Sequence, residues 1–272
     1  MGNRYRPARG ANEALAPIDE DTATGQTVLG PVWQAATPRS AVPLDAKNHL
    51  GVWLPAHERH LSDVMMVPGA KRFERLDDGR PAYQRHKYRQ ALTFVKQREV
   101  FVDIGAHCGL WSMQAEQDFA SIVAFEPHPV HGAIYPFNLK SDRWILHRCA
   151  LGAEAGFVRL DTETGSSGNT HVAAATQESD PGVGIAMHPL DSFGLERIDL
   201  LKIDTEGYEL PIVVGATDTL RRCRPVVVIE QKGKEADNRG RPANEALAFL
   251  SDLGFVPLCP PISGDHFLGL KR

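Results

Sequence analysis

One stretch, residues 99–111, constrains the fold more than any other part of the sequence. Residues 100–104 form a short, β-prone apolar run with a single charged residue, Asp103. A run this short and this apolar is typical of a central strand covered on both faces. Gly105 and Gly109 follow it, which indicates a sharp turn that something approaches closely. Asp103 would lie at the C-terminal end of this strand, where open α/β sheets bind their ligands.

The rest of the chain repeats the order strand, turn, helix after this stretch. Strands are predicted at residues 100–104, 121–125, 144–151, 198–203, 225–229, 255–258 and 266–270. Helices are predicted at residues 81–98, 130–140, 210–222 and 244–253, and an added hairpin at 157–160 and 170–175. We therefore predict a doubly wound, Rossmann-like α/β fold: a mostly parallel sheet with helices on both faces and an antiparallel last strand.

Composition excludes several classes of protein. Of the 272 residues, 42% are hydrophobic and 24% are charged, which supplies enough apolar material for a sizeable core. The net charge of -4 gives no general attraction to nucleic acid or to an anionic membrane. No stretch approaches the roughly 20 apolar residues of a membrane span, and the N-terminus lacks the apolar core of a signal peptide. The 4 separated cysteines indicate reduced thiols rather than a disulfide framework, so we expect a cytoplasmic protein without a membrane partner.

The chain divides into three predicted parts. Residues 1–55 have weak apolar periodicity and predict an extended or flexible arm, which wraps the domain, contacts a second copy of the chain to form a homo-oligomer, or is a plain tail. Residues 56–98 predict a helical segment packed on the core, and residues 99–272 predict the α/β domain. His57 and His60 are one residue short of the spacing in the HExxH zinc motif, so no metal site is predicted.

The residues around the glycine turn distinguish between nucleotide ligands. Asp103 would repel the pyrophosphate that a G-x-G-x-x-G turn binds, and no P-loop pattern occurs in the sequence. A carboxylate here suits a ligand with a cationic group, such as the amino-acid part of S-adenosylmethionine. Glu126 ends the next predicted strand, where it could accept hydrogen bonds from two ribose hydroxyls. The third strand would then contact adenine at Cys149 or Ala150.

Six segments carry motifs in a recognisable order. They are Phe101-Val-Asp-Ile-Gly-Ala-His-Cys-Gly109, Ala124-Phe-Glu-Pro127, Cys149-Ala-Leu-Gly152, Pro189-Leu-Asp-Ser-Phe193, Asp199-Leu-Leu-Lys-Ile-Asp-Thr-Glu-Gly-Tyr-Glu209 and Val227-Val-Ile-Glu230. Together they resemble the FkbM-type S-adenosylmethionine-dependent methyltransferases, over roughly residues 81–272. The resemblance implies a class I methyltransferase fold and methyl transfer, most often to a hydroxyl oxygen of a sugar, a glycan or a small metabolite. The chain departs from the family at His107, where Asn is usual.

The strand ends and the resemblance together predict the site residues. The predicted cofactor-binding residues are Asp103, Gly105, Ala106, His107, Gly109, Glu126, Pro127, Cys149, Ala150, Asp204 and Tyr83. Methyl transfer to an alcohol is an in-line displacement that also removes the hydroxyl proton. Glu206 is the predicted general base, with Asp204 and Glu230 as further catalytic candidates. The alternative is that these carboxylates only cap the next helix or pair with Lys202. Residues 165–171 are a candidate flap over the site.

Three functions stay open from the sequence. The leading hypothesis is an O-methyltransferase whose partner is a small-molecule or glycan hydroxyl acceptor. A nucleic-acid or protein methyltransferase is the enzymatic alternative, which the basic face of residues 85–98 favours. The lack of an Asp/Asn-Pro-Pro-Tyr/Phe segment at residues 204–207, the lack of a Pro-Cys dipeptide and the net negative charge oppose a nucleic-acid acceptor. The third hypothesis is a module that binds the cofactor without turnover.

Overall fold

The computed structural model describes residue 43, residues 45–61, residue 63 and residues 74–161, 171–176, 184–231 and 244–271. All of them belong to one compact unit, residues 31–272. The predicted flap lies outside the described residues except for residue 171, and so does most of the predicted arm. The arm's contact with a second copy therefore stays a prediction.

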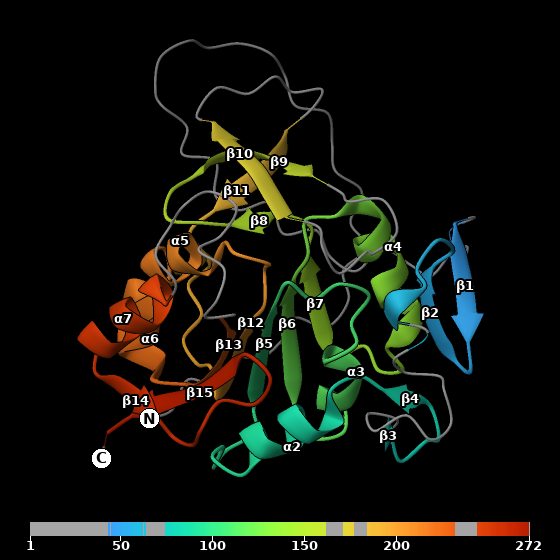
Figure 1. The fold of residues 1–272 in the computed structure, drawn as a ribbon, viewed down its shortest axis with the longest axis horizontal. Helices are drawn as coiled ribbons and strands as arrows, with labels where there is room; N and C mark the ends of the chain where they lie inside the picture. Colours follow the sequence, from blue (N-terminus) through green and yellow to red (C-terminus); the bar gives the residue numbers. More distant parts are fainter. Residues whose placement is uncertain are drawn as a thin grey trace, which may run out of the picture. The chain divides into compact units, whose positions relative to one another are not determined.

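A seven-stranded sheet forms the centre of the described fold (Figure 1). In spatial order its strands are β14 (Phe255–Pro257), β15 (Asp265–Leu270), β13 (Val226–Glu230), β12 (Leu200–Ile203), β5 (Val100–Ile104), β6 (Ser121–Phe125) and β7 (Trp144–His147). Neighbouring strands are parallel from β13 to β7, whereas β15 is antiparallel to both of its neighbours. The predicted mostly parallel sheet with an antiparallel last strand is confirmed.

The two central strands are buried because both of their faces are covered. All residues of β12 and all but the first residue of β5 are buried. Their parallel pairing places Lys202 opposite Asp103. Charged groups in a buried sheet need partners, because an unpaired charge there is costly. The register therefore brings a lysine and a carboxylate together in the centre of the sheet.

Helices pack on the two faces of this sheet through separate hydrophobic clusters. They are α2 (Arg85–Leu92), α3 (Ser112–Ala115), α4 (Pro129–Asn138), α5 (Glu209–Val214), α6 (Thr217–Cys223) and α7 (Glu245–Asp252). One cluster joins Val102 and Ile104 of β5 to residues of α5, α6 and α7. The other joins Phe101 to residues of α2, α3 and α4. This alternation of side chains along β5 is the layer order that the strand–helix rhythm predicted.

Two predicted helices differ in the structure. Within the predicted helix 81–98, Pro81–Ala82 form strand β4, which pairs with β3 (Glu74–Arg75), and α2 begins only at Arg85. The predicted helix 210–222 is broken into α5 and α6 at Gly215. A Cβ at Gly215 would collide with the carbonyl oxygen of Gly152, so the break is a point of close packing between segments distant in the sequence.

The end of the predicted arm forms a packed hairpin, β1 (Ala46–His49) and β2 (Val52–Pro55). Val52 and Leu54 are buried in a cluster with residues of α3 and α4. Asn138 of α4 accepts the backbone N–H of Trp53 at 2.7 Å and donates its amide group to the carbonyl oxygens of Trp53 and Cys108. One side chain thus connects the hairpin to the glycine turn after β5.

A small sheet with the order β10-β9-β11-β8 is added to the core. Its strands are β8 (Ala150–Leu151), β9 (Gly156–Asp161), β10 (His171–Thr176) and β11 (Ile185–His188). The predicted hairpin is confirmed as the antiparallel pair β9 and β10. The predicted strand 144–151 is divided, because its last residues leave the central sheet and form β8. In the described part of the chain, none of the helices combines the length and apolarity needed to cross a membrane.

Candidate functional site

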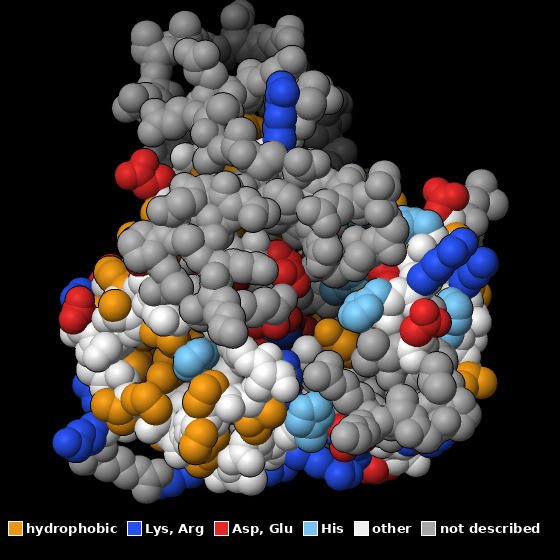
Figure 2. Space-filling view, in the orientation of Figure 1, with side chains coloured by type: hydrophobic (Ala, Val, Ile, Leu, Met, Phe, Trp, Pro, Cys, Tyr) orange, Lys and Arg blue, Asp and Glu red, His pale blue; other side chains and the backbone are white. Residues whose placement is uncertain are grey.

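A pocket opens at the carboxyl edge of the central sheet, beside the ends of β5, β6 and β12. The predicted site residues that line it are Tyr83, Gly105, Ala106, His107, Glu126, Pro127, Cys149, Ala150, Asp204 and Glu206. Among the described residues, Asp103, Gly109 and Glu230 are predicted site residues that do not line it. Figure 2 shows acidic side chains near the middle of this face, with histidine side chains beside them.

The turn after β5 leaves no room for a side chain at its two glycines. Gly105 and Gly109 have φ angles of 73° and 83°, in the left-handed region that favours glycine. A Cβ at Gly105 would collide with the carbonyl oxygen of Asp204, and one at Gly109 would lie 3.0 Å from the ring of Tyr135. The turn is therefore held tightly between the loop after β12 and helix α4.

His107 also has a left-handed backbone, with φ 52°. This conformation is uncommon for residues other than glycine, but Asn, Asp and His adopt it more readily than most. The physical requirement at this position thus explains why His can stand where Asn is usual. Its backbone N–H donates to Glu126 at 2.7 Å. This hydrogen bond connects the turn after β5 to the residue that follows β6.

Glu126 is buried and ionised at the end of β6. Its carboxylate accepts the backbone N–H groups of His107 at 2.7 Å and His128 at 2.9 Å, and it lies 3.5 Å from Nδ1 of His131. Burial alone would raise its pKa, but hydrogen bonds from His131 and from the two backbone amides outweigh burial and hold the pKa of Glu126 below its usual value. A carboxylate of this kind can accept further hydrogen bonds from a ligand's hydroxyls.

Three histidine rings form a stack next to Glu126. The ring centroids of His107 and His131 are 3.9 Å apart, and those of His128 and His131 are 4.1 Å apart. Burial and the neighbouring His131 lower the pKa of His128 to about 4. His128 is therefore neutral near pH 7, and the tilted rings of His107 and His131 line the pocket beside the carboxylate.

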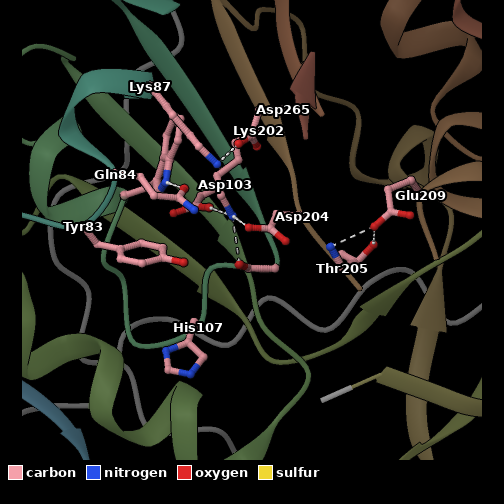
Figure 3. Close-up of polar contacts among 12 residues, drawn as sticks. Tyr83, Gln84, Lys87, Asp103, His107, Lys202, Asp204, Thr205, Glu209 and Asp265 are labelled. Atoms are coloured by element: carbon pink, nitrogen blue, oxygen red, sulfur yellow. Dashed lines mark hydrogen bonds and ion pairs between the residues drawn. The ribbon is translucent and has the colours of Figure 1, made fainter. Parts of the chain in front are cut away.

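Lys202 lines the pocket, whereas its buried neighbour Asp103 does not. Asp103 is fully buried, and its carboxylate accepts the hydroxyl of Ser112 at 2.7 Å. The ammonium nitrogen of Lys202 is 3.4 Å from Asp103 and 3.6 Å from Asp204, and it donates to the carbonyl oxygen of Gly105 at 3.2 Å (Figure 3). Burial would lower the pKa of Lys202, but the charges of Asp204 and Asp103 outweigh it and raise the pKa, so the lysine is charged.

Three carboxylates gather where β12 and β13 end. One oxygen each of Asp204, Glu206 and Glu230 lies within 4.8 Å of the others, and such a group could hold a cation or a polar acceptor. Acidic groups of this kind are also common without an ion. Burial, and then the charges of Asp204 and Glu230, raise the pKa of Tyr83 above its usual value. The Tyr83 hydroxyl therefore stays protonated as a hydrogen-bond donor facing these acids.

The loop that carries Glu206 is fixed by the helix after it. Glu206 has φ 53° and Gly207 has φ 98°, both in the left-handed region. Glu209 accepts the backbone N–H and the hydroxyl of Thr205 and the backbone N–H of Gly207, each at 3.1 Å (Figure 3). Glu209 is therefore the carboxylate that holds this loop, whereas Asp204 pairs with Lys202, as the alternative prediction had it, and Glu206 lines the pocket.

Several pocket-lining residues were missed by sequence reasoning. They are Leu61, Leu110, Trp111, His131, Leu160, Tyr208 and Ile212. Most are apolar and carry no sequence signal that separates them from core residues. Only His131 has one, since it is titratable and follows His128 by one helical turn.

Comparison with known proteins matches this chain to methyltransferases. Residues 103–257 match a family model described as the methyltransferase FkbM domain. Methyltransferase 1 of Beauveria bassiana (strain ARSEF 2860) is 24% identical over 163 residues, which cover 50% of this chain and 66% of that protein. Methyltransferase sdnD of Sordaria araneosa is 28% identical over 192 residues, which cover 57% of this chain and 72% of that protein.

A solved structure is also similar. The crystal structure of methyltransferase FkbM from Methylobacillus flagellatus KT aligns with a TM-score of 0.41 and 18% identity. The alignment covers 64% of this chain and 44% of that one. The chain thus spans slightly less than two thirds of the Beauveria protein and less than half of the crystallised one.

Proposed function

The chain belongs to the FkbM methyltransferase family, and on that premise we propose that it transfers the methyl group of S-adenosylmethionine to a hydroxyl of a sugar, a glycan or a small metabolite. That it is a methyltransferase follows from the family and from the two methyltransferases that match it. One observation carries the choice of cofactor. A glycine turn without room for a Cβ lies against a buried, ionised carboxylate at the end of the adjacent strand.

The adenosine half of the cofactor fits one end of the pocket. Glu126 offers an anionic acceptor for the two ribose hydroxyls, and it is ionised near pH 7. Phe125, Cys149, Ala150 and Leu151 give an apolar wall of the kind that a flat base needs. These residues come from the ends of β6 and β8 and from the turn before β8, where nucleotides bind in open α/β sheets.

The other end of the pocket suits the methyl acceptor. S-adenosylmethionine supplies the activated methyl group, and the protein must align the acceptor and remove its proton. We propose that Glu206 is the general base, because it lines the pocket on a loop that Glu209 holds in place. Glu230, whose carboxylate lies close to that of Glu206, would orient the acceptor, and the protonated hydroxyl of Tyr83 would donate a hydrogen bond to it.

The ion pairs along the basic face of residues 85–98 bear on the nucleic-acid alternative. Three of the five lysines and arginines on the basic face of residues 85–98 form ion pairs, whereas Arg89 and Lys96 are exposed. Arg85 pairs with Asp77 at 2.9 Å, and Arg98 pairs with Asp118 at 2.9 Å. Lys87 is buried and paired with Asp265. Paired cations are poor phosphate contacts, because a phosphate would have to displace the carboxylates. This favours a small hydroxyl acceptor.

Titration calorimetry with S-adenosylhomocysteine tests the cofactor. Wild type should bind it, and Glu126→Gln should weaken binding about 10- to 100-fold, because hydrogen bonds to a charged acceptor contribute about 1.5–3 kcal/mol. Glu116→Gln is the matched control. Glu116 is also a buried carboxylate that accepts backbone N–H groups, from Lys140 and Ser141, but it does not line the pocket. No heat with wild type, or equal affinities for Glu126→Gln and wild type, would contradict the cofactor assignment.

A methyl-transfer screen tests the acceptor. Radiolabelled S-adenosylmethionine would be incubated with sugars and small hydroxyl metabolites, and in parallel with nucleic acid and with protein. We expect label only on the hydroxyl compounds, and none on a compound whose hydroxyl is already an ether. Label on nucleic acid or protein instead would replace the proposed acceptor class.

A further inference from the structure

We propose that Lys202 is a positioning residue for the amino-acid end of the cofactor, and that Asp204, held by Lys202, receives the cofactor's ammonium group in place of Asp103. The inference rests on the proposed function, because it concerns the same cofactor site. It assigns new roles to three charged residues at the centre of the fold.

Lys202 connects three segments of the chain, and we call the group of Lys202, Asp103, Asp204 and the carbonyl of Gly105 the junction. A lysine ammonium has three N–H donors. Three acceptors surround it: Asp103 at 3.4 Å, the carbonyl oxygen of Gly105 at 3.2 Å and Asp204 at 3.6 Å (Figure 3). These acceptors belong to three different segments, namely β5, the glycine turn and the loop after β12. One side chain therefore fixes the turn relative to the loop.

A role in stability alone does not account for this arrangement. Lys202 lies in a strand whose other residues, Leu200, Leu201 and Ile203, are apolar and fully buried. Burying an ion pair costs desolvation, and an apolar pair of similar volume is often as stable or more so. Lys202 also lines the pocket, whereas its partner Asp103 does not. The position of the ammonium group is thus coupled to the shape of the pocket wall.

Asp103 and Asp204 have different surroundings. Asp103 has an exposed fraction of 0% and is engaged by Ser112 and Lys202. The Asp204 side chain is 20% exposed and lines the pocket. Of the two carboxylates, only Asp204 can reach a ligand without a rearrangement of the sheet. Asp103 then acts as the counter-ion that keeps Lys202 charged.

The charges at this junction fit the cofactor. One lysine faces two aspartates at the junction, and oxygens of Glu206 and Glu230 lie within 4.8 Å of Asp204, so acidic groups outnumber the lysine on this side of the pocket. S-adenosylmethionine has two positive groups, the sulfonium and the ammonium, against one carboxylate. The two cationic groups of the cofactor suit this excess of carboxylates, and removing Lys202 would release Asp204 from the position in which it meets the ammonium group.

Two ligands separate this role from a structural one. S-adenosylhomocysteine has the amino-acid end, whereas 5′-methylthioadenosine has the same nucleoside and sulfur without it. In titration calorimetry, Lys202→Met should lower the affinity for S-adenosylhomocysteine at least about tenfold, because Asp204 would no longer be held where it meets the ammonium group, and a loss of this size is expected when a hydrogen bond between charged groups is lost. The affinity for methylthioadenosine should change by less than about twofold, because Glu126 and the adenine wall are untouched. Both ligands are measured on the full chain.

The matched control removes the neighbouring buried ion pair. Lys87→Met combined with Asp265→Asn deletes the pair between α2 and β15, neither member of which lines the pocket, and leaves no extra charge beside Lys202. It should lower stability but leave the ratio of the two affinities unchanged. If Lys202→Met does not fold, Asp204→Asn keeps the pair of Lys202 with Asp103 and should show the same selective loss.

The outcomes are distinct. If wild type binds neither ligand, the proposed function fails. If wild type binds both, and Lys202→Met or Asp204→Asn weakens both equally or neither, the proposed function stands and the role of Lys202 is refuted. A selective loss for S-adenosylhomocysteine supports the inference.

Discussion

At the scale of single residues, the site depends on backbone conformations that most side chains avoid. His107 and Glu206 both have positive φ angles, 52° and 53°, and both line the pocket. Such conformations cost about 1–3 kcal/mol and persist only where the surroundings hold them. At His107 the surrounding contact is Glu126, and around Glu206 it is Glu209, which accepts the amides on either side of it. The strained backbone at His107 and Glu206 thus occurs where both residues line the pocket.

Glu206 has the most direct test at this scale. Glu206→Gln keeps the size of the side chain but removes its basicity, so the turnover number should fall about 10²- to 10⁴-fold, the usual contribution of a general base. The affinity for S-adenosylhomocysteine should stay within about threefold. Kinetics on an acceptor found in the screen, together with calorimetry, measure the two. Full turnover in Glu206→Gln with loss in Glu230→Gln would move the base to Glu230.

At the scale of elements, the strands could be predicted better than the helices. The central strands are short apolar runs whose ends carry Asp103, Glu126 and Asp204, so pattern alone located them. Helix α2 could not be delimited, because Pro81 suits a first helical turn as well as it suits β4. The break at Gly215 depends on contact with Gly152, and a contact between distant residues leaves no local pattern.

For the site, too, the sequence predicted the residues at the strand ends but not the contacts between them. Strand ends gave the carboxylates, but the register of β5 and β12 decides that Asp103 meets Lys202. The hairpin β1–β2 was predicted as part of a flexible arm, because its composition resembles that of a tail. Its order depends on Asn138, which bonds Trp53 from another element. Contacts between residues distant in the sequence, such as Asn138 with Trp53, cannot be predicted from the pattern of a single sequence.

Helix α5 gives the prediction at the scale of elements. Glu209 has an exposed fraction of 3% and accepts three hydrogen bonds from the preceding loop. Glu209→Ala should lower the free energy of unfolding by about 2–4 kcal/mol, since buried amides would lose their acceptor. Chemical denaturation measures the loss, and hydrogen exchange at Thr205 and Gly207 should become faster.

The control for Glu209 is Glu245→Ala. Glu245 is likewise acidic and in the first turn of a helix, α7, and no side-chain cap forms at that helix start. Its loss should cost only the interaction with the helix dipole, about 0.3–1 kcal/mol. Equal effects of the two substitutions would show that Glu209 acts through the dipole and not by holding the loop.

At the scale of the whole molecule, the pocket unites residues from Leu61 to Ile212, although most of them lie far apart in sequence. The parallel sheet makes this convergence unavoidable, because every strand from β13 to β7 delivers its carboxyl end to the same edge. Charges converge there too. Titration of buried groups near this edge should therefore be visible in the stability of the entire fold.

His147 gives the last prediction, a pH dependence of global stability. It is buried at the end of β7 against Phe125 and Phe193. Burial, with a smaller effect of His188, lowers its pKa from 6.5 to about 4. Between those values the unfolded chain binds the proton that the folded chain rejects, so stability should fall as the pH drops from about 6.5 to about 4. Denaturation midpoints across this window measure it. His147→Phe should flatten the slope, and an unchanged slope would mean that other groups carry the acid sensitivity.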